Sequence, residues 1–198
     1  MNICVFLSAA DLDERYTAPA RELAALIGKG GHTLVWGGSD VGLMKVIADG
    51  VRQTGGRLVG VSAEFLRWAD RADVDEMVIT TDLAHRKAEL LARSDGVVIL
   101  VGGLGTLDEA TEVVELKKHG LHKKPVVVLN TAGFYDGLQA QLSRMESEGF
   151  LPRPLNELVY FAEQGGQVLP YLESVLQQHV STKPSPVEAE NVGNQCRN

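Results

Sequence analysis

Seven short apolar runs alternate with segments of helical periodicity, and this alternation limits the possible folds more than any other feature of the chain. The runs are rich in Val, Ile and Leu without polar alternation, which is typical of strands buried on both faces of a sheet. They lie at residues 3–7, 33–36, 58–61, 77–79, 97–101, 126–129 and 158–161. Helices are expected at about 16–29, 42–54, 82–93, 106–119, 134–148 and 166–179. This order predicts an α/β fold: a Rossmann-like, doubly wound parallel sheet with helices on both faces.

The length of 198 residues suits one domain with a substantial core, which we expect to span residues 1–180. Residues 181–198 are polar, contain two prolines and show no periodicity, so a disordered tail is expected there. The first residues lack a basic region and turn acidic by Asp11, which indicates a strand and not a signal peptide. No run approaches the roughly 18 apolar residues of a membrane span. We therefore expect a cytoplasmic protein without membrane contacts.

The formal net charge of −7 argues against a nucleic-acid polymer as partner, because binding such a polymer needs a basic surface. A small phosphorylated ligand needs only one local positive site and is compatible with this charge. The cysteines, Cys4 and Cys196, form no metal-ligand spacing, and neither do His85, His119 and His122. We expect neither a metal nor another cofactor.

Three predicted strands end in loops of small residues, at the edge where parallel sheets bind ligands. The run 97–101 stops at Gly102-Gly103-Leu104-Gly105-Thr106, and a helical pattern follows. Such a loop aims backbone N–H groups and a helix dipole at an anion. Gly37 and Gly38 follow the second strand, and Ser8 follows the first. Two glycine loops could line one phosphate or ribose site, or they could simply turn the chain between strand and helix.

Two interpretations of Glu109 are open from spacing alone. Thr106 and Glu109 fit a capping box, in which the threonine caps the helix and the glutamate folds back onto the cap N–H. In the other interpretation, Glu109 faces a ligand bound in the loop. One carboxylate rotamer cannot do both.

Arg86 and Lys87 are also open to two interpretations. Asp82 is a plausible N-cap for the helix that contains them, and the helix dipole disfavours cations near this end. An exposed Asp82–Arg86 pair would explain the arginine without a ligand. Alternatively, the two cations serve an anionic ligand, for which the planar donors of Arg86 are well suited.

Three motifs resemble those of a known family. Residues 101–109, VGGLGTLDE, match a PGGxGTxxE signature except that Val101 replaces the proline. Residues 37–45 are similar to a GGGxxGLMG element, and Arg86-Lys87 is similar to an Arg-Lys pair at the start of the preceding helix. On these motifs, over about residues 1–160, the chain resembles the LOG ("Lonely guy") family, cytokinin-activating phosphoribohydrolases once named lysine decarboxylases.

The resemblance implies that a nucleoside 5′-monophosphate binds with its phosphate on the 102–106 loop, and that Ser8, Gly37 and Gly38 line the site. Water then cleaves the N-glycosidic bond to give free base and ribose 5-phosphate. The carboxylate of Glu109 stabilises the oxocarbenium-like sugar or activates water. Arg86 holds substrate or assists departure of the base, and Lys87 is secondary. Family members are dimers or larger, so the resemblance also implies at least a homodimer.

Two segments depart from the family pattern, so the base is left open, with an N6-prenyl adenine as the default. Where the family has Thr-Trp-x-Gln-Leu-Gly, this chain has Glu115-Leu116-Lys117-Lys118-His119-Gly120. Where the family has Asp-Met-His-x, this chain has Asp82-Leu83-Ala84-His85. Glu115 is either an additional site residue or a solvated helix charge beside Lys118. The remaining lysines near this helix end suit a cationic C-terminus.

The alternative function is a non-catalytic carrier of a nucleotide or of molybdenum cofactor, because LOG-like folds include such carriers. A carrier needs the glycine loops but no acid beside a sugar. Arg86 and Glu109 facing one cleft would therefore favour the enzyme. Trp36 and Trp68 are predicted to be packing residues and not platforms for a base.

Overall fold

A computed structural model describes residues 1–181, with side chains through residue 178. It contains one seven-stranded sheet of order β4-β3-β2-β1-β5-β6-β7, in which all neighbouring strands pair in parallel. The strands are β1 Asn2–Phe6, β2 Thr33–Trp36, β3 Arg57–Ala63, β4 Glu76–Thr80, β5 Gly96–Ile99, β6 Val126–Leu129 and β7 Tyr160–Ala162. The predicted doubly wound α/β fold is confirmed. The predicted tail lies, apart from Ser181, outside the described residues.

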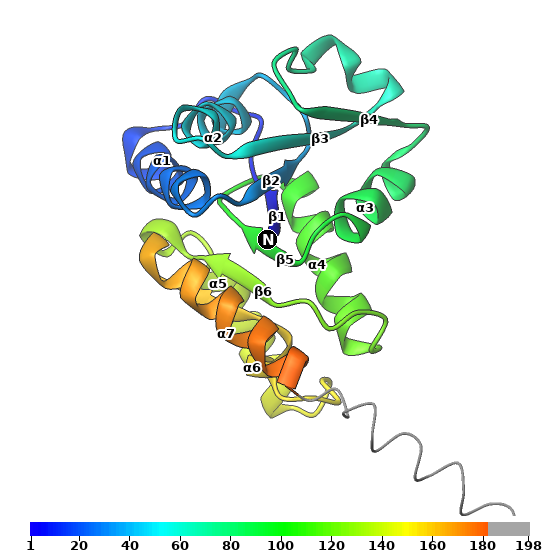
Figure 1. Cartoon of the computed structure of the whole chain (residues 1–198). Helices are drawn as coiled ribbons and strands as arrows, with labels where there is room; N and C mark the ends of the chain where they lie inside the picture. Colours follow the sequence, from blue (N-terminus) through cyan, green and yellow to red (C-terminus); the bar gives the residue numbers. More distant parts are fainter. Residues whose placement is uncertain (182–198) are drawn as a thin grey trace, which may run out of the picture.

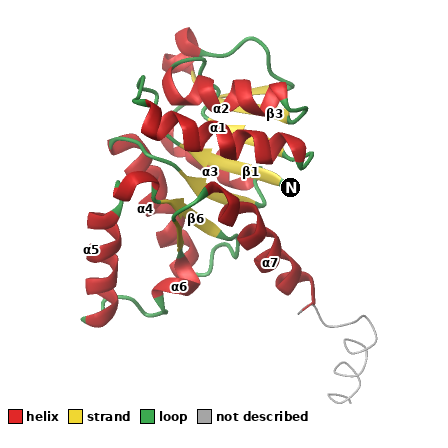
Figure 2. Cartoon of the chain, turned by 90° about the vertical axis from the view of Figure 1, so that its left-hand side faces the viewer, coloured by secondary structure: helices red, strands yellow, loops and turns green. Residues whose placement is uncertain are grey.

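Helices cover both faces of this sheet (Figures 1 and 2). α1, α2 and α7 contribute to one apolar cluster, and α3, α4 and α5 contribute to the other. The α-helices are α1 Glu14–Lys29, α2 Gly42–Gln53, α3 Leu83–Ala92, α4 Leu104–Lys118, α5 Asp136–Ser147, α6 Leu155–Leu158 and α7 Val168–Ser181. Among the described residues, none of the helices combines the length and apolarity that a membrane crossing requires.

Alternate residues of the central strand point into the two layers. Ile3 and Val5 of β1 are buried against the α1/α2/α7 layer, whereas Cys4 and Phe6 are buried against the α3/α4/α5 layer. A strand buried on both faces must be apolar at every position, which is the pattern of the sequence. The core therefore explains why these runs were recognisable as strands.

The order in which strands are added to the sheet changes side at β1. Successive strands run outward from β1 to β4, and β5 then pairs on the other side of β1. The Ser8 N–H donates to the Val101 carbonyl at 3.0 Å, which holds the loops after β1 and β5 together. Ligands of open parallel sheets bind at such a switch point, beyond the carboxyl ends of the strands.

Some boundaries differ from those expected. Leu158 ends the short helix α6, so the last strand begins at Tyr160 and not at residue 158. The segment after β3 forms the 3-10 helix η1 (Glu64–Ala69), which the sequence did not indicate. Its Trp68 is 79% exposed, so the prediction that Trp68 is a packing residue is wrong. Trp36, in contrast, is completely buried, as predicted.

Candidate active site

The loop after β5 leads directly into α4. The helix begins at Leu104 with Gly103 as its N-cap, and no side chain among the described residues caps it. Of the two interpretations of Glu109, the capping box at Thr106 is therefore wrong, because Thr106 already lies inside the helix. The first backbone N–H groups of a helix have no intrahelical acceptors, so this end can bind an anion.

The glycines of this loop have different surroundings. A Cβ added to Gly102 would lie 2.1 Å from the buried Thr106 hydroxyl oxygen, so this position has no room for a side chain. A Cβ on Gly103 or Gly105 would meet no described atom within 4 Å. Leu104, between them, is 85% exposed. The outer surface of the loop is therefore open to a ligand, whereas Gly102 packs against the helix.

Arg86 and Glu109 form a buried ion pair between α3 and α4. The Arg86 Nη1 donates to Glu109 Oε1 at 2.8 Å, and the Arg86 Nε donates to the Val61 carbonyl at 2.9 Å. The exposed fractions of the two residues are only 7% and 9%. Asp82 caps α3, as predicted, by accepting from the His85 N–H at 2.8 Å. Of the two interpretations of Arg86, the exposed Asp82–Arg86 pair is therefore wrong.

Burial sets the electrostatics of this pair. It raises the pKa of Glu109 above the usual value for a glutamate, while the neighbouring Arg86 guanidinium acts in the opposite direction. A carboxylate held in this way is poorly hydrated. It can stabilise positive charge that develops beside it more strongly than an exposed carboxylate could.

The loop after β2 makes room for Arg86. A Cβ on Gly37 would lie 2.2 Å from Arg86 Nη2, so a larger residue would occupy the position of the guanidinium. Gly38 has a φ of 75°, a conformation that side chains rarely adopt. Both glycines are buried. The two glycine loops thus have different roles: one is open, and the other is packed around the arginine.

Arg86 also lines a cavity of about 110 Å³ beside these loops. Ser62 and Trp68 line the same cavity, together with Gly37, Met44 and Leu66. The Ser62 hydroxyl is fully buried and has no hydrogen-bond partner among the described residues. Sequence reasoning missed Ser62, because a serine inside a strand has no distinctive pattern. Its position after Val61, whose carbonyl binds Arg86, becomes visible only in the fold.

The remaining candidates, Ser8, Lys87 and Glu115, make contacts outside the Arg86–Glu109 pair. The Ser8 hydroxyl accepts from the Ala10 N–H at 3.0 Å in the loop beside β5. Lys87 forms ion pairs with Asp108, at 2.9 Å, and with Glu112, and it does not line the Arg86 cavity. Glu115 is exposed and pairs with Lys118 at 2.6 Å, as the solvated-charge interpretation predicts.

Comparisons with known proteins agree with these motifs. Residues 44–172 match a family model described as "Possible lysine decarboxylase". A probable cytokinin riboside 5′-monophosphate phosphoribohydrolase of Oryza sativa subsp. japonica is 34% identical over 185 residues, which cover 92% of this chain and 83% of the relative. A cytokinin riboside 5′-monophosphate phosphoribohydrolase of Mycobacterium tuberculosis is 35% identical over 160 residues, which cover 79% of this chain and 86% of the relative.

Among solved structures, the molybdenum cofactor binding protein of Rippkaea orientalis is similar in fold, with a TM-score of 0.69. At 24% identity, over 88% of this chain and 96% of that one, the likeness concerns the fold alone. Fold and site together define a single-domain, Rossmann-like α/β protein with a buried Arg–Glu pair at its switch point. Within that class, the chain belongs to the LOG family, whose model carries the older description of lysine decarboxylase.

Proposed function

We propose that the protein is a phosphoribohydrolase that cleaves the N-glycosidic bond of a nucleoside 5′-monophosphate. The products are a free base and ribose 5-phosphate. The observation that carries this proposal is the buried Arg86–Glu109 pair, because Glu109 lies on α4, the helix that begins in the open glycine loop. The relatives named for this reaction cover most of the chain.

The 5′-phosphate binds at the start of α4, on Gly102, Gly103, Leu104, Gly105 and Thr106. This position combines uncapped N–H groups, the positive end of the helix dipole and an open surface. Glu109 lies five residues beyond Leu104, which is on the order of 7 Å along a helix axis. One ligand can therefore contact both, with its phosphate at the loop and its sugar at the carboxylate.

Glu109 stabilises the oxocarbenium-like sugar as the bond to the base breaks, and it can orient the attacking water. The Arg86 guanidinium opposes the effect of burial on the pKa of Glu109, and its second hydrogen bond, to the Val61 carbonyl, fixes the position of the pair. Because Arg86 also lines the cavity, it can contact the departing base. Ser8, Gly37 and Gly38 line the site, and Lys87 supports it through its pairs on α4.

The cavity beside Arg86 holds the base. Ser62 offers a hydroxyl without a partner among the residues that the structure describes, and Trp68 offers an exposed aromatic face. Together they suit a planar heterocycle with polar edges. A cytokinin riboside 5′-monophosphate is the default substrate, and an AMP-like nucleotide is the second candidate.

The alternative is a carrier of a nucleotide or of molybdenum cofactor, and it draws on the fold shared with the Rippkaea orientalis protein. A carrier has no need of a buried carboxylate held by an arginine. Glu109 contacts Arg86 and does not fold back onto a cap at Thr106, which favours the enzyme.

The proposed enzyme is cytoplasmic and forms at least a homodimer. An apolar cavity of about 230 Å³ lies between α4 and α5, lined by residues that include Val114, Leu142 and Met145. A second copy would cover this apolar surface. Light scattering of the purified protein tests the dimer, and a monomer at micromolar concentration would contradict it.

The direct test of the function is a screen of nucleoside 5′-monophosphates, plain and prenylated, without added metal. Chromatography measures the free base and the ribose 5-phosphate. Equal amounts of both products from at least one substrate are expected. A protein that binds these nucleotides or a molybdenum cofactor tightly, yet releases base from none, would support the carrier instead.

A further inference from the structure

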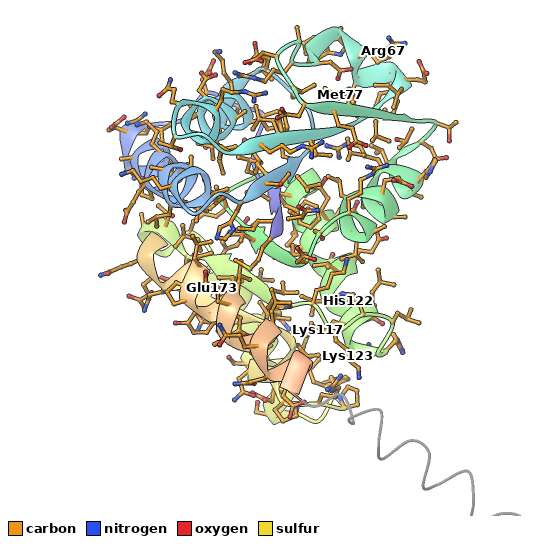
Figure 3. The ribbon with its side chains drawn as sticks, viewed as in Figure 1. Arg67, Met77, Lys117, His122, Lys123 and Glu173 are labelled. Carbon is orange, nitrogen blue, oxygen red and sulfur yellow. The ribbon has the colours of Figure 1, made fainter. Side chains whose placement is uncertain are left out.

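A second cavity lies at the opposite end of α4 from the proposed active site. Its volume is about 560 Å³, and it is formed by the end of α4, the loop before β6, the α6 segment and α7. Because α4 begins at the carboxyl edge of the sheet, its last turn lies at the amino edge. Figure 3 shows Lys117, His122 and Lys123 in this region beside α7. The nucleotide proposed above would not reach it.

Lys117 is the unusual residue of this cavity. It is 7% exposed and lines the cavity, yet no described residue gives its ammonium group a hydrogen bond or an ion pair. The neighbouring Lys118 differs, since it pairs with Glu115 at 2.6 Å. A cationic helix end explains Lys118 and does not explain why Lys117 is buried without a carboxylate.

The charges around Lys117 make the cavity cationic. Lys123 and Arg153 line it, and the acidic lining residue Glu157 already pairs with Arg153 at 3.2 Å. His122 contacts the Val113 carbonyl through Nε2 at 2.8 Å, and burial lowers its pKa, which favours the neutral ring. Three cations therefore face one carboxylate.

Burial also lowers the pKa of Lys117, to about 8; the nearby Arg153 acts in the same direction, and Glu157 acts in the opposite direction. Most Lys117 side chains still carry a proton at pH 7. The cavity thus holds a poorly hydrated positive charge at physiological pH. An anion entering it would replace the missing hydration and the missing partner.

We propose that this cavity is a second ligand site, which binds a small molecule through a phosphate group. The phosphate contacts Lys117, Lys123 and Arg153. The remainder of the molecule lies against Val175 and the Tyr171 ring, which is held by stacking on Tyr160 at 4.5 Å. The cavity has the size of a small-molecule site. This site is independent of the reaction proposed for Glu109.

Calorimetric titration of the full chain with pyrophosphate tests the site. Wild-type protein should bind, and Lys117→Met should bind at least about tenfold more weakly, a difference of about 1.4 kcal/mol. Lys118→Met is the matched control, because it removes the same charge one residue away, and it should stay within about twofold of wild type. Pyrophosphate bound at the glycine loop does not depend on Lys117, so only the Lys117-dependent heat reports on the cavity.

Equal binding by wild type and Lys117→Met would overturn the proposal, and so would equal losses in Lys117→Met and Lys118→Met. Arg153→Met provides a second variant outside the core, and it should also weaken pyrophosphate binding. Sulfate, whose charge is constant, should bind wild type more weakly at pH 9 than at pH 7, because Lys117 loses its proton. In Lys117→Met this pH effect should shrink, even though Lys123, Arg153, Glu157, His122 and Tyr171 still face the cavity.

Discussion

At the scale of the residue, the Arg86–Glu109 pair is the centre of the account. The sequence named both residues as candidates but assigned each a wrong alternative partner, Asp82 for the arginine and Thr106 for the glutamate. Both alternatives were local, within four residues along the chain, as spacing arguments always are. The real contact joins two residues that are 23 positions apart in the sequence and lie on different helices. Only the packing of α3 beside α4 could bring these side chains together.

Arg86→Met tests the electrostatics of this pair. It should destabilise the protein by about 3–5 kcal/mol at pH 7, because Glu109 is left buried and charged without a partner. Denaturant unfolding measures the loss. The double variant Arg86→Met with Glu109→Gln should recover much of this stability, since no buried charge remains.

The sign of the pH effect follows from the raised pKa of Glu109. The folded protein holds the proton at a pH where the unfolded chain has released it. The contribution of this group to the free energy of unfolding therefore rises as the pH falls through that range. In Arg86→Met the loss of stability should become smaller toward pH 5. A loss that is independent of pH would contradict the assignment.

Gly37→Ala tests whether the position of the Arg86 guanidinium matters, because this variant keeps the arginine but displaces its side chain. The added Cβ would lie 2.2 Å from the end of the Arg86 side chain, which is flexible and can move away. Stability should fall by about 1–3 kcal/mol, because the displaced guanidinium weakens its buried pair with Glu109, and base release should fall at least about tenfold. Gly166→Ala, with open space at its Cβ, is the control and should have normal activity. Normal turnover by Gly37→Ala would show that the Arg86 position is unimportant.

At the scale of the element, the strands were predictable because runs buried on both faces must be apolar throughout. The ends of elements were less predictable. α4 begins at Leu104, two residues before the expected cap. The sequence did not indicate this first turn, because it contains Gly105, a poor helix former. The helix η1 was missed because its six residues are too few to show a helical periodicity, and exposure of Phe65 and Trp68 shows that it does not bury an apolar face.

Two glycines at the start of α4 should respond in opposite ways to the same change. Gly102→Ala should destabilise the protein by about 1–3 kcal/mol, because its Cβ would clash with the buried, β-branched Thr106 at 2.1 Å. Gly105→Ala should keep or raise stability by up to about 1 kcal/mol, since alanine favours a helix. Its methyl group would narrow the phosphate site, so KM should rise. Similar stabilities for the two variants would contradict this division of roles.

At the scale of the whole molecule, the sheet order brings the candidate loops together. The loops after β1 and β5 are adjacent because these strands pair. The sequence predicted a parallel sheet with these loops at its carboxyl edge, but not the order of its strands. The amino-edge cavity was not predictable. Lys117 looked like an ordinary helix-end cation, and its burial depends on how α7 and the segment near Arg153 cover that edge.

Lys117→Met should stabilise the whole protein at pH 7. The folded pKa of about 8 lies below the unfolded value of 10.5, so the unfolded chain holds the proton more tightly. Lys117 therefore costs stability below about pH 8, and this cost disappears as the pH rises to 10.5. Thermal unfolding should show a gain on the order of 2 kcal/mol at pH 7, which shrinks toward pH 10. A destabilised variant at pH 7 would contradict the burial of an unpaired ammonium.

The central claim is that the Glu109 carboxylate acts on the glycosidic bond while the glycine loop holds the phosphate. The most direct measurement compares single-turnover base release by wild type, Glu109→Gln and Glu115→Gln on the best substrate of the screen. Glu115→Gln removes an exposed carboxylate from the same helix and should behave as wild type. Glu109→Gln should bind the nucleotide within a few-fold of wild type yet release base at least about 100-fold more slowly. Near-normal release by Glu109→Gln would contradict the mechanism.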